Sequence, residues 1–214
     1  KFSADFDTLE LLNGKDTSTM LNESIYLWSY LNNRGLFKTA VGVSDSHGRT
    51  SEAGFGRTLI AVTNDDPAEL NIDEVWSNLK ANKAVMGGGI FITISVDEAG
   101  MGEEIQHSSP VPVHIQAQAA DWVPVQQVDL WVNGEIHSTH VLTNYGEADP
   151  DHPAIRLDTV VEVEATSDIW VAAVAYGQDS DRLNPVFRSC RPVGMTNAVR
   201  VDVDGDGSFT PPNL

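Results

Sequence analysis

The chain has little that could cross-link it or hold it in a membrane. Of its 214 residues only Cys190 is a cysteine, so an intrachain disulfide is excluded and cysteine usage leaves the cellular compartment open. The sequence has no run close to the roughly 18 consecutive apolar residues of a membrane span, and no basic-then-apolar leader. We therefore predict no membrane span.

Basic residues are also scarce. Lysine and arginine number 13 against 31 aspartates and glutamates, which gives a formal net charge of −18. Such a charge repels a phosphate backbone, so nucleic acid is excluded as a partner. Residues 1–90 carry 8 basic and 12 acidic side chains, whereas residues 91–214 carry 5 and 19. This shift, together with the glycine run at 87–89, predicts two domains, residues 1–89 and residues 90–214.

One stretch, residues 41–48, combines an apolar strand pattern with groups that can bind a metal. The β-branched and apolar residues at 39–43 predict a buried strand, and Asp45 and His47 follow in the loop after it. Residues two apart on an extended backbone point to the same side, so this carboxylate and imidazole can face one metal ion. The alternative is a turn closed by the Asp45 side chain, with Gly48 at a positive φ.

The first 90 residues read as alternating strands and helices. Strands are predicted at 8–12, 39–43 and 57–62, and amphipathic helices at 20–33 and after Asn71, which has a helix-capping pattern. This order is typical of α/β units around a mostly parallel sheet. A closed eight-stranded barrel needs about 250 residues, so the pattern predicts the C-terminal part of a barrel.

Beyond residue 89 the apolar residues recur with a period of two. The strands predicted from this period are 91–96, 111–117, 125–132, 155–163 and 169–175. Asn133 and Gly134 predict a hairpin turn between two of the strands of this region. The pattern indicates an antiparallel, immunoglobulin-like β-sandwich. Trp122, Trp131 and Trp170 are expected in its core, and an exposed one would be a candidate for stacking on carbohydrate.

The C-terminal stretch has the beginning of a calcium-binding loop. Hard oxygen ligands for Ca²⁺ occur at alternate positions, namely Asp202, Asp204, Asp206 and Ser208. A glycine occupies the sixth position of the loop, where the calcium loop turns sharply. The twelfth position is Asn213 instead of a bidentate glutamate, and no flanking helices are predicted. A weak calcium site and a solvated acidic turn therefore both remain open.

Several stretches, taken in order and spacing, resemble one enzyme family. They are residues 6–14, 42–47, 56–60, 73–81 and 86–91. Together they resemble the polymerase-and-histidinol-phosphatase (PHP) metallohydrolases, in particular the branch related to bacterial carbaryl hydrolases. The first 90 residues match closely and the remainder loosely. The resemblance implies a fold class of α/β plus all-β: the C-terminal part of a distorted (β/α)7 barrel, followed by the immunoglobulin-like β-sandwich.

The same resemblance implies a site and a reaction. The family's centre holds two or three ions of zinc, manganese or iron, and Asp45 would bind one of them and His47 another as its last ligands. The centre would act on a small phosphoester or related ester. Arg57 would contact an anionic substrate, although a surface ion pair explains it equally well. The family's other ligands lie upstream, and residues 1–38 contain no histidine. The N-terminal part of the same barrel is therefore the expected partner, and this part alone is expected to be inactive.

The C-terminal tail resembles that of exported members of the branch, which favours an extracellular or periplasmic location. A second hypothesis assigns the chain no catalysis. In it, the β-sandwich is a binding module that recognises a surface or a glycan, with calcium at residues 202–208, and the first 89 residues are an inert scaffold.

Overall fold

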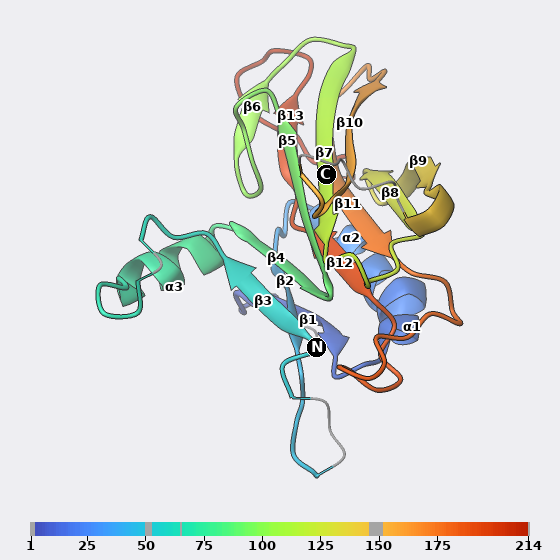
Figure 1. The fold of residues 1–214 in the computed structure, drawn as a ribbon. Coiled ribbons are helices and arrows are strands. Elements are labelled where there is room, and N and C mark those ends of the chain that lie inside the picture. Colours follow the sequence, from blue (N-terminus) through green and yellow to red (C-terminus); the bar gives the residue numbers. More distant parts are fainter. Residues whose placement is uncertain (1–2, 50–52, 65, 146–151, 214) are drawn as a thin grey trace.

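A computed structural model describes residues 3–49, 53–64, 66–145 and 152–213 (Figure 1). The strands are β1 (Thr8–Asn13), β2 (Thr39–Val43), β3 (Arg57–Ile60), β4 (Ala84–Gly88), β5 (Ile90–Val96), β6 (Glu104–Gln106), β7 (Val111–Ala119), β8 (Gln127–Val132), β9 (Glu135–Val141), β10 (Ile155–Val163), β11 (Ile169–Tyr176), β12 (Val193–Thr196) and β13 (Val199–Asp202). The helical segments are α1 (Thr17–Thr19), the π-helix η1 (Met20–Ser24), α2 (Ile25–Asn32), α3 (Ile72–Lys80) and the 3-10 turn η2 (Thr143–Tyr145).

The strands form three sheets around one core. The largest has the order β3-β4-β12-β11-β13-β6, with β8 paired to β11 and β9 paired to β8. A three-stranded antiparallel sheet, β10-β7-β5, lies against it, with β5 in contact with β11 and β12 (Figure 1). Along β7 buried and half-buried residues alternate, because side chains on a strand point to opposite faces. The third sheet is the parallel pair β1-β2.

The segment from α1 to α2 is attached to the large sheet through two buried tryptophans. The rings of Trp28 and Trp170 meet edge to face with centroids 5.2 Å apart. The indole N–H of Trp28 donates to the carbonyl of Lys38 at 2.8 Å, and that of Trp170 donates to Asn33 Oδ1 at 2.7 Å. Both large rings are therefore buried without an unpaired donor.

Several local predictions are confirmed. Asn71 caps α3, since its side chain accepts hydrogen bonds from the backbone N–H groups of Asp73 and Glu74. Asn133 and Gly134 have positive φ angles of 51° and 89° and connect β8 to β9, as a hairpin turn of this sequence requires. None of the residues of α3 is buried, and Figure 1 shows this helix projecting from the body of the molecule.

The predicted fold class is wrong. Strands predominate in the described residues, and they form the three sheets above in place of part of a (β/α)7 barrel followed by an immunoglobulin-like sandwich. Although α3 lies between them, β3 and β4 are antiparallel, and β4 continues into the large sheet through β12. Glycines permit the close pairing of β4 with β12, because a Cβ on Gly87 would lie 2.8 Å from the Cα of Gly194. The boundary predicted at residue 89 falls between β4 and β5, and the large sheet contains strands from both sides of it.

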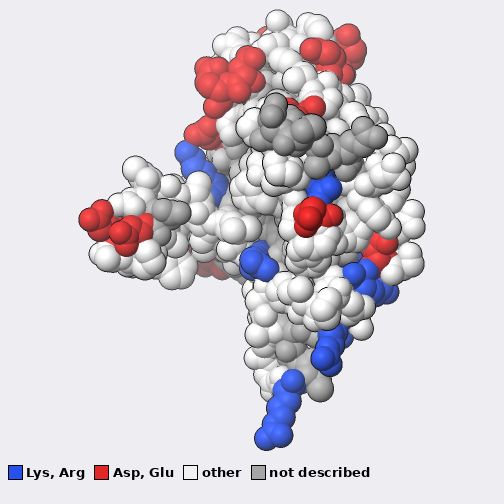
Figure 2. Space-filling view, viewed as in Figure 1, with Lys and Arg blue, Asp and Glu red and all other residues white. Residues whose placement is uncertain are grey.

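Charge is distributed unevenly over the surface as well as along the sequence. Figure 2 shows acidic side chains gathered at the end of the molecule where β6 lies and on α3, with basic side chains towards the opposite end. No helix of the described residues has the length and hydropathy needed to cross a membrane.

Candidate metal sites

The first candidate site lies where the two parallel strands end. The ladder between β1 and β2 runs from the pair Thr8 and Thr39 to the pair Asn13 and Val43, so both carboxyl ends meet. The N–H of Gly14 then donates to the Val43 carbonyl at 2.9 Å. Gly14 has a φ of 57°, a left-handed conformation that glycine adopts without strain.

Asp45 and His47 come together in the loop after β2. Asp45 has a φ of 43°, and its Oδ1 lies 3.4 Å from His47 Nδ1. The His47 side chain is 79% exposed and that of Asp45 is 50% exposed. The oxygen and the nitrogen lie in one place as predicted, but on a left-handed backbone at Asp45 and not on the extended backbone from which their approach was predicted. Within the described residues, however, no third histidine, cysteine or carboxylate completes a group with them, and a protein zinc site has three or four protein ligands.

Side chains, and not only backbone pairing, hold β2 in position. Asn197 is 1% exposed; its Oδ1 accepts the N–H of Ala40 at 2.7 Å, and its Nδ2 donates to the carbonyls of Ala40 and Ala84. On β3, Thr58 Oγ1 accepts the N–H of Gly42 at 3.1 Å and donates to the Gly42 carbonyl at 3.0 Å. Asn197 could not be predicted from the sequence, because Ala40 and Ala84 are 157 and 113 residues away and no local pattern marks it.

Arg57, the predicted substrate contact, begins β3 and is exposed. Its guanidinium lies 5.8 Å from the ring centroid of Phe187. Among the described residues no carboxylate lies within ion-pair distance of it. A contact with an anionic substrate stays a prediction.

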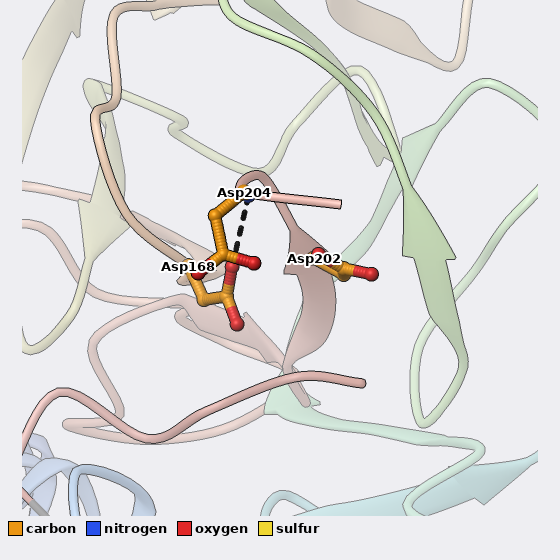
Figure 3. A group of neighbouring side chains, drawn as sticks. All are labelled: Asp168, Asp202 and Asp204. Atoms are coloured by element: carbon orange, nitrogen blue, oxygen red, sulfur yellow. Dashed lines mark hydrogen bonds between the residues drawn. The ribbon is translucent and has the colours of Figure 1, made fainter. Parts of the chain in front are cut away.

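The second candidate site is a group of three carboxylates at the C-terminal end of β13. Oxygens of Asp168, Asp202 and Asp204 all lie within 4.8 Å of one another (Figure 3). Asp168 was missed in the sequence because it is 34 positions from Asp202. The antiparallel register that pairs Ile169 with Val201 brings it there. Asp206 and Ser208, which were predicted to join this loop, instead bond to each other, since Asp206 Oδ1 accepts the N–H and the hydroxyl of Ser208.

Backbone N–H groups already satisfy the two buried members of this group. Asp168 is 3% exposed and accepts from the N–H groups of Val203, Asp204 and Thr210, at 2.8, 3.3 and 2.6 Å. Asp202, also 3% exposed, accepts from Gly205 at 2.7 Å and Gly207 at 2.9 Å. These bonds explain how two carboxylates are buried side by side. An all-oxygen set suits Ca²⁺ better than zinc, so calcium binding here stays a prediction.

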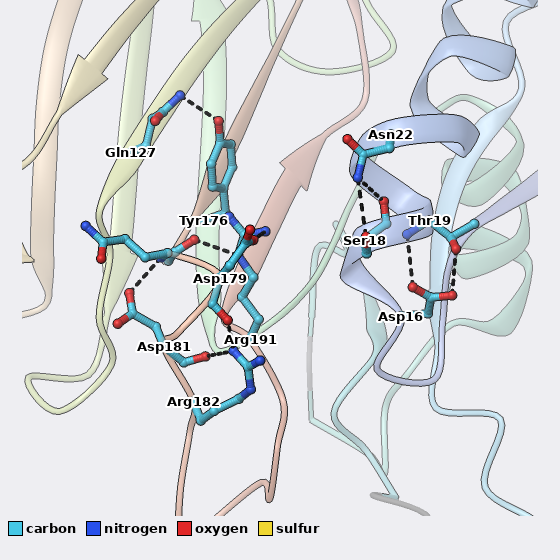
Figure 4. Close-up of polar contacts among 12 residues, drawn as sticks. Asp16, Ser18, Thr19, Asn22, Gln127, Tyr176, Asp179, Asp181, Arg182 and Arg191 are labelled. Atoms are coloured by element: carbon cyan, nitrogen blue, oxygen red, sulfur yellow. Dashed lines mark hydrogen bonds and ion pairs between the residues drawn. The ribbon is translucent and has the colours of Figure 1, made fainter.

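A third polar cluster lies where β8 and β11 meet the loop after β11 (Figure 4). The hydroxyl of Tyr176 donates to Asp129 Oδ2 at 2.7 Å, and Gln127 Nε2 donates to the Tyr176 hydroxyl at 2.6 Å. Arg191 pairs with Asp179 at 2.6 Å and covers the Tyr176 ring. Burial, followed by the bond to Asp129, raises the pKa of the Tyr176 phenol above its ordinary value.

Comparison of the chain with protein-family models, with curated proteins and with solved structures found no match.

Proposed function

We propose that the chain is part of a metal-dependent hydrolase of phosphoesters or related esters, in which Asp45 binds one divalent metal ion of the centre and His47 binds another. The observation that carries the proposal is the convergence of Asp45 Oδ1 and His47 Nδ1, 3.4 Å apart, at the exposed end of a parallel strand pair. The order and spacing of the sequence stretches that resemble the PHP metallohydrolases support the same reaction class.

A zinc, manganese or iron ion bound there would polarise the ester and supply hydroxide near neutral pH. The residues of this chain orient its ligands. Because His47 Nδ1 faces the Asp45 carboxylate, Nε2 is the ring nitrogen directed away from that carboxylate and left to bind a metal. Asp45 has a second oxygen, Oδ2, with which to bind. Asn197 and Thr58 fix the strand that carries both ligands.

Two ligands are too few for catalysis, so the proposal includes a further segment of the same enzyme that supplies the others. The open edge of β1 supports this part of the proposal. β1 is paired with β2 alone among the described strands, whereas parallel strands are normally buried within larger sheets. An unpaired edge presents N–H and carbonyl groups to an additional strand. A parallel segment that pairs there would end at the same edge of the sheet as β2, with β1 between them.

The test is metal content and ester hydrolysis of the complete enzyme and its Asp45→Ala and His47→Ala variants. We expect both variants to lose bound metal and to lose activity by about 100-fold or more, since even residues that only orient metal ligands cost 10–100-fold. His137→Ala is the matched control, because His137 is an exposed histidine on β9. Unchanged metal content and activity in Asp45→Ala would contradict the proposal.

A further inference from the structure

A largely apolar cavity of about 390 Å³ lies beside β3, and Arg57 is the one residue of its lining that was considered above as a site residue. Residues from four parts of the chain line it: β3, the β4–β5 connection, the loop after β7 and the loop before β12. Those on which the argument rests are Arg57, Leu59, Phe91, Trp122 and Phe187. The volume lies within the range of small-molecule sites, which are mostly apolar with a few polar groups.

Large apolar side chains of this cavity remain in contact with solvent. Trp122 is 49% exposed, Leu59 is 43% exposed and Phe91 is 39% exposed. Trp122 therefore departs from the prediction that it would fill the core, whereas Trp131 and Trp170 are buried as expected. Apolar rings that converge on a hollow and stay accessible are typical of a binding site. Their flat faces suit a planar apolar ligand.

Of the described residues that line the cavity, Arg57 is the one with a cationic group, and none of them is acidic. The guanidinium has no carboxylate partner within the described part of the chain, which is notable in a protein with a net charge of −18. An arginine at the edge of an apolar hollow can pair with an acid group of a ligand through two parallel hydrogen bonds. Sugars fit less well, because the walls offer few groups to bind hydroxyls.

We propose that this cavity binds a small organic anion with a planar apolar body. The acid group pairs with the Arg57 guanidinium, and the body lies against Phe91, Trp122 and Phe187. Gly89 keeps the cavity in this shape: it has a φ of 90°, and a Cβ there would lie 2.9 Å from Leu183 Cδ1. Binding requires no metal, so this inference stands or falls independently of the hydrolase proposal.

The test measures binding of biphenyl-4-carboxylate and of its neutral analogue, biphenyl-4-carboxamide, by calorimetry in the presence of a metal chelator. We expect the carboxylate to bind at least about tenfold more tightly than the amide, the effect of one charge-assisted pair. Arg57→Gln should remove this preference and leave amide binding unchanged. Trp122→Ala should weaken both ligands by about tenfold, because both lose the ring contact. Phenyl phosphate in place of the carboxylate distinguishes a phosphate from a carboxylate ligand.

Matched controls are Arg188→Gln, an exposed arginine in the loop before β12, and Trp76→Ala, a tryptophan 57% exposed on α3. Neither should change the affinity of either ligand. Because Arg57 and Trp122 are exposed, their variants should melt at the wild-type temperature, which separates lost binding from lost folding. Equal binding of acid and amide by the wild type, or unchanged affinity in Arg57→Gln or Trp122→Ala, would overturn the proposal.

Discussion

Asn197 is the residue whose replacement tests the structure most directly, because its buried side chain connects β2 to β4. In Asn197→Ala the N–H of Ala40 loses its acceptor, and the carbonyls of Ala40 and Ala84 each lose a donor. An unpaired buried group costs about 1–3 kcal/mol, and the lost bonds to the carbonyls add to that. We expect a loss of about 3 kcal/mol in the free energy of unfolding. For a chain of this size that loss lowers the melting temperature by about 6–12 °C.

Thermal unfolding followed by circular dichroism measures this effect. The control is Asn22→Ala, since Asn22 is exposed and its Nδ2 donates to the Ser18 carbonyl at 2.8 Å on a helix surface. This control should lose less than about 1 kcal/mol. Cys190, the only cysteine, is 0% exposed, so its reaction with a thiol reagent gives a second measure of opening. A melting temperature of Asn197→Ala within about 2 °C of the wild type would refute the reasoning.

Three further predictions follow from the polar groups. Tyr176→Phe removes the donor to the buried Asp129 and should lower the free energy of unfolding by about 2 kcal/mol in a denaturant titration. In the wild type, ultraviolet titration should show Tyr176 still protonated at the pH where exposed tyrosines ionise. Ionisation of Tyr176 together with the exposed tyrosines would contradict its raised pKa. The hydrogen bond from His114 lowers the pKa of Asp158 below its ordinary value. The ionised Asp158 therefore stabilises the fold at pH values above the ordinary pKa of an aspartate, and this stabilisation is lost as the pH falls through the lowered pKa. Because both side chains are nearly half exposed, Asp158→Asn should lower the free energy of unfolding near pH 6 by less than about 1 kcal/mol. In stronger acid the variant should be as stable as the wild type. A stability difference that does not change with pH would contradict this. Calcium at about 100 times its dissociation constant should raise the free energy of unfolding by about 2.7 kcal/mol, and Asp168→Asn should abolish this gain. Equal melting temperatures of the wild type in calcium and in chelator would contradict the calcium prediction.

Elements whose signal is local were predictable. The strands predicted at 155–163 and 39–43 have the same bounds as β10 and β2 of the structure. They could be predicted because an apolar strand pattern is a property of a few consecutive residues. The hairpin at Asn133 and Gly134 was predictable for a related reason, since these two residues tolerate positive φ angles.

The direction of strands was not predictable in this way. An apolar strand followed by a helix and another strand is compatible with parallel or antiparallel pairing, and here β1 and β2 are parallel whereas β3 and β4 are antiparallel. What decides the pairing of β4 is contact with β12, more than 100 residues further along the chain. Such contacts leave no trace in a short window of sequence.

The two candidate metal sites differ in the same respect. Asp45 and His47 could be paired from the sequence because only one residue separates them. Asp168 could not be found from the sequence. It lies beside Asp202 only because β11 and β13 pair in the register that joins Ile169 to Val201, and this register depends on contacts along both strands. The sequence pattern of a calcium loop named four consecutive alternating positions, of which the fold brings Asp202 and Asp204 into the group.

The attachment of β2 bears on the metal site proposed at the end of this strand. A backbone ladder holds β2 to β1, whereas towards the large sheet single side chains, Asn197 and Thr58, bond to its backbone groups. The strand is therefore fixed near its middle, at Ala40 and Gly42, while the loop after it is left open to solvent. Ligands positioned this way are held by the fold yet accessible, which a metal ion and its substrate both require.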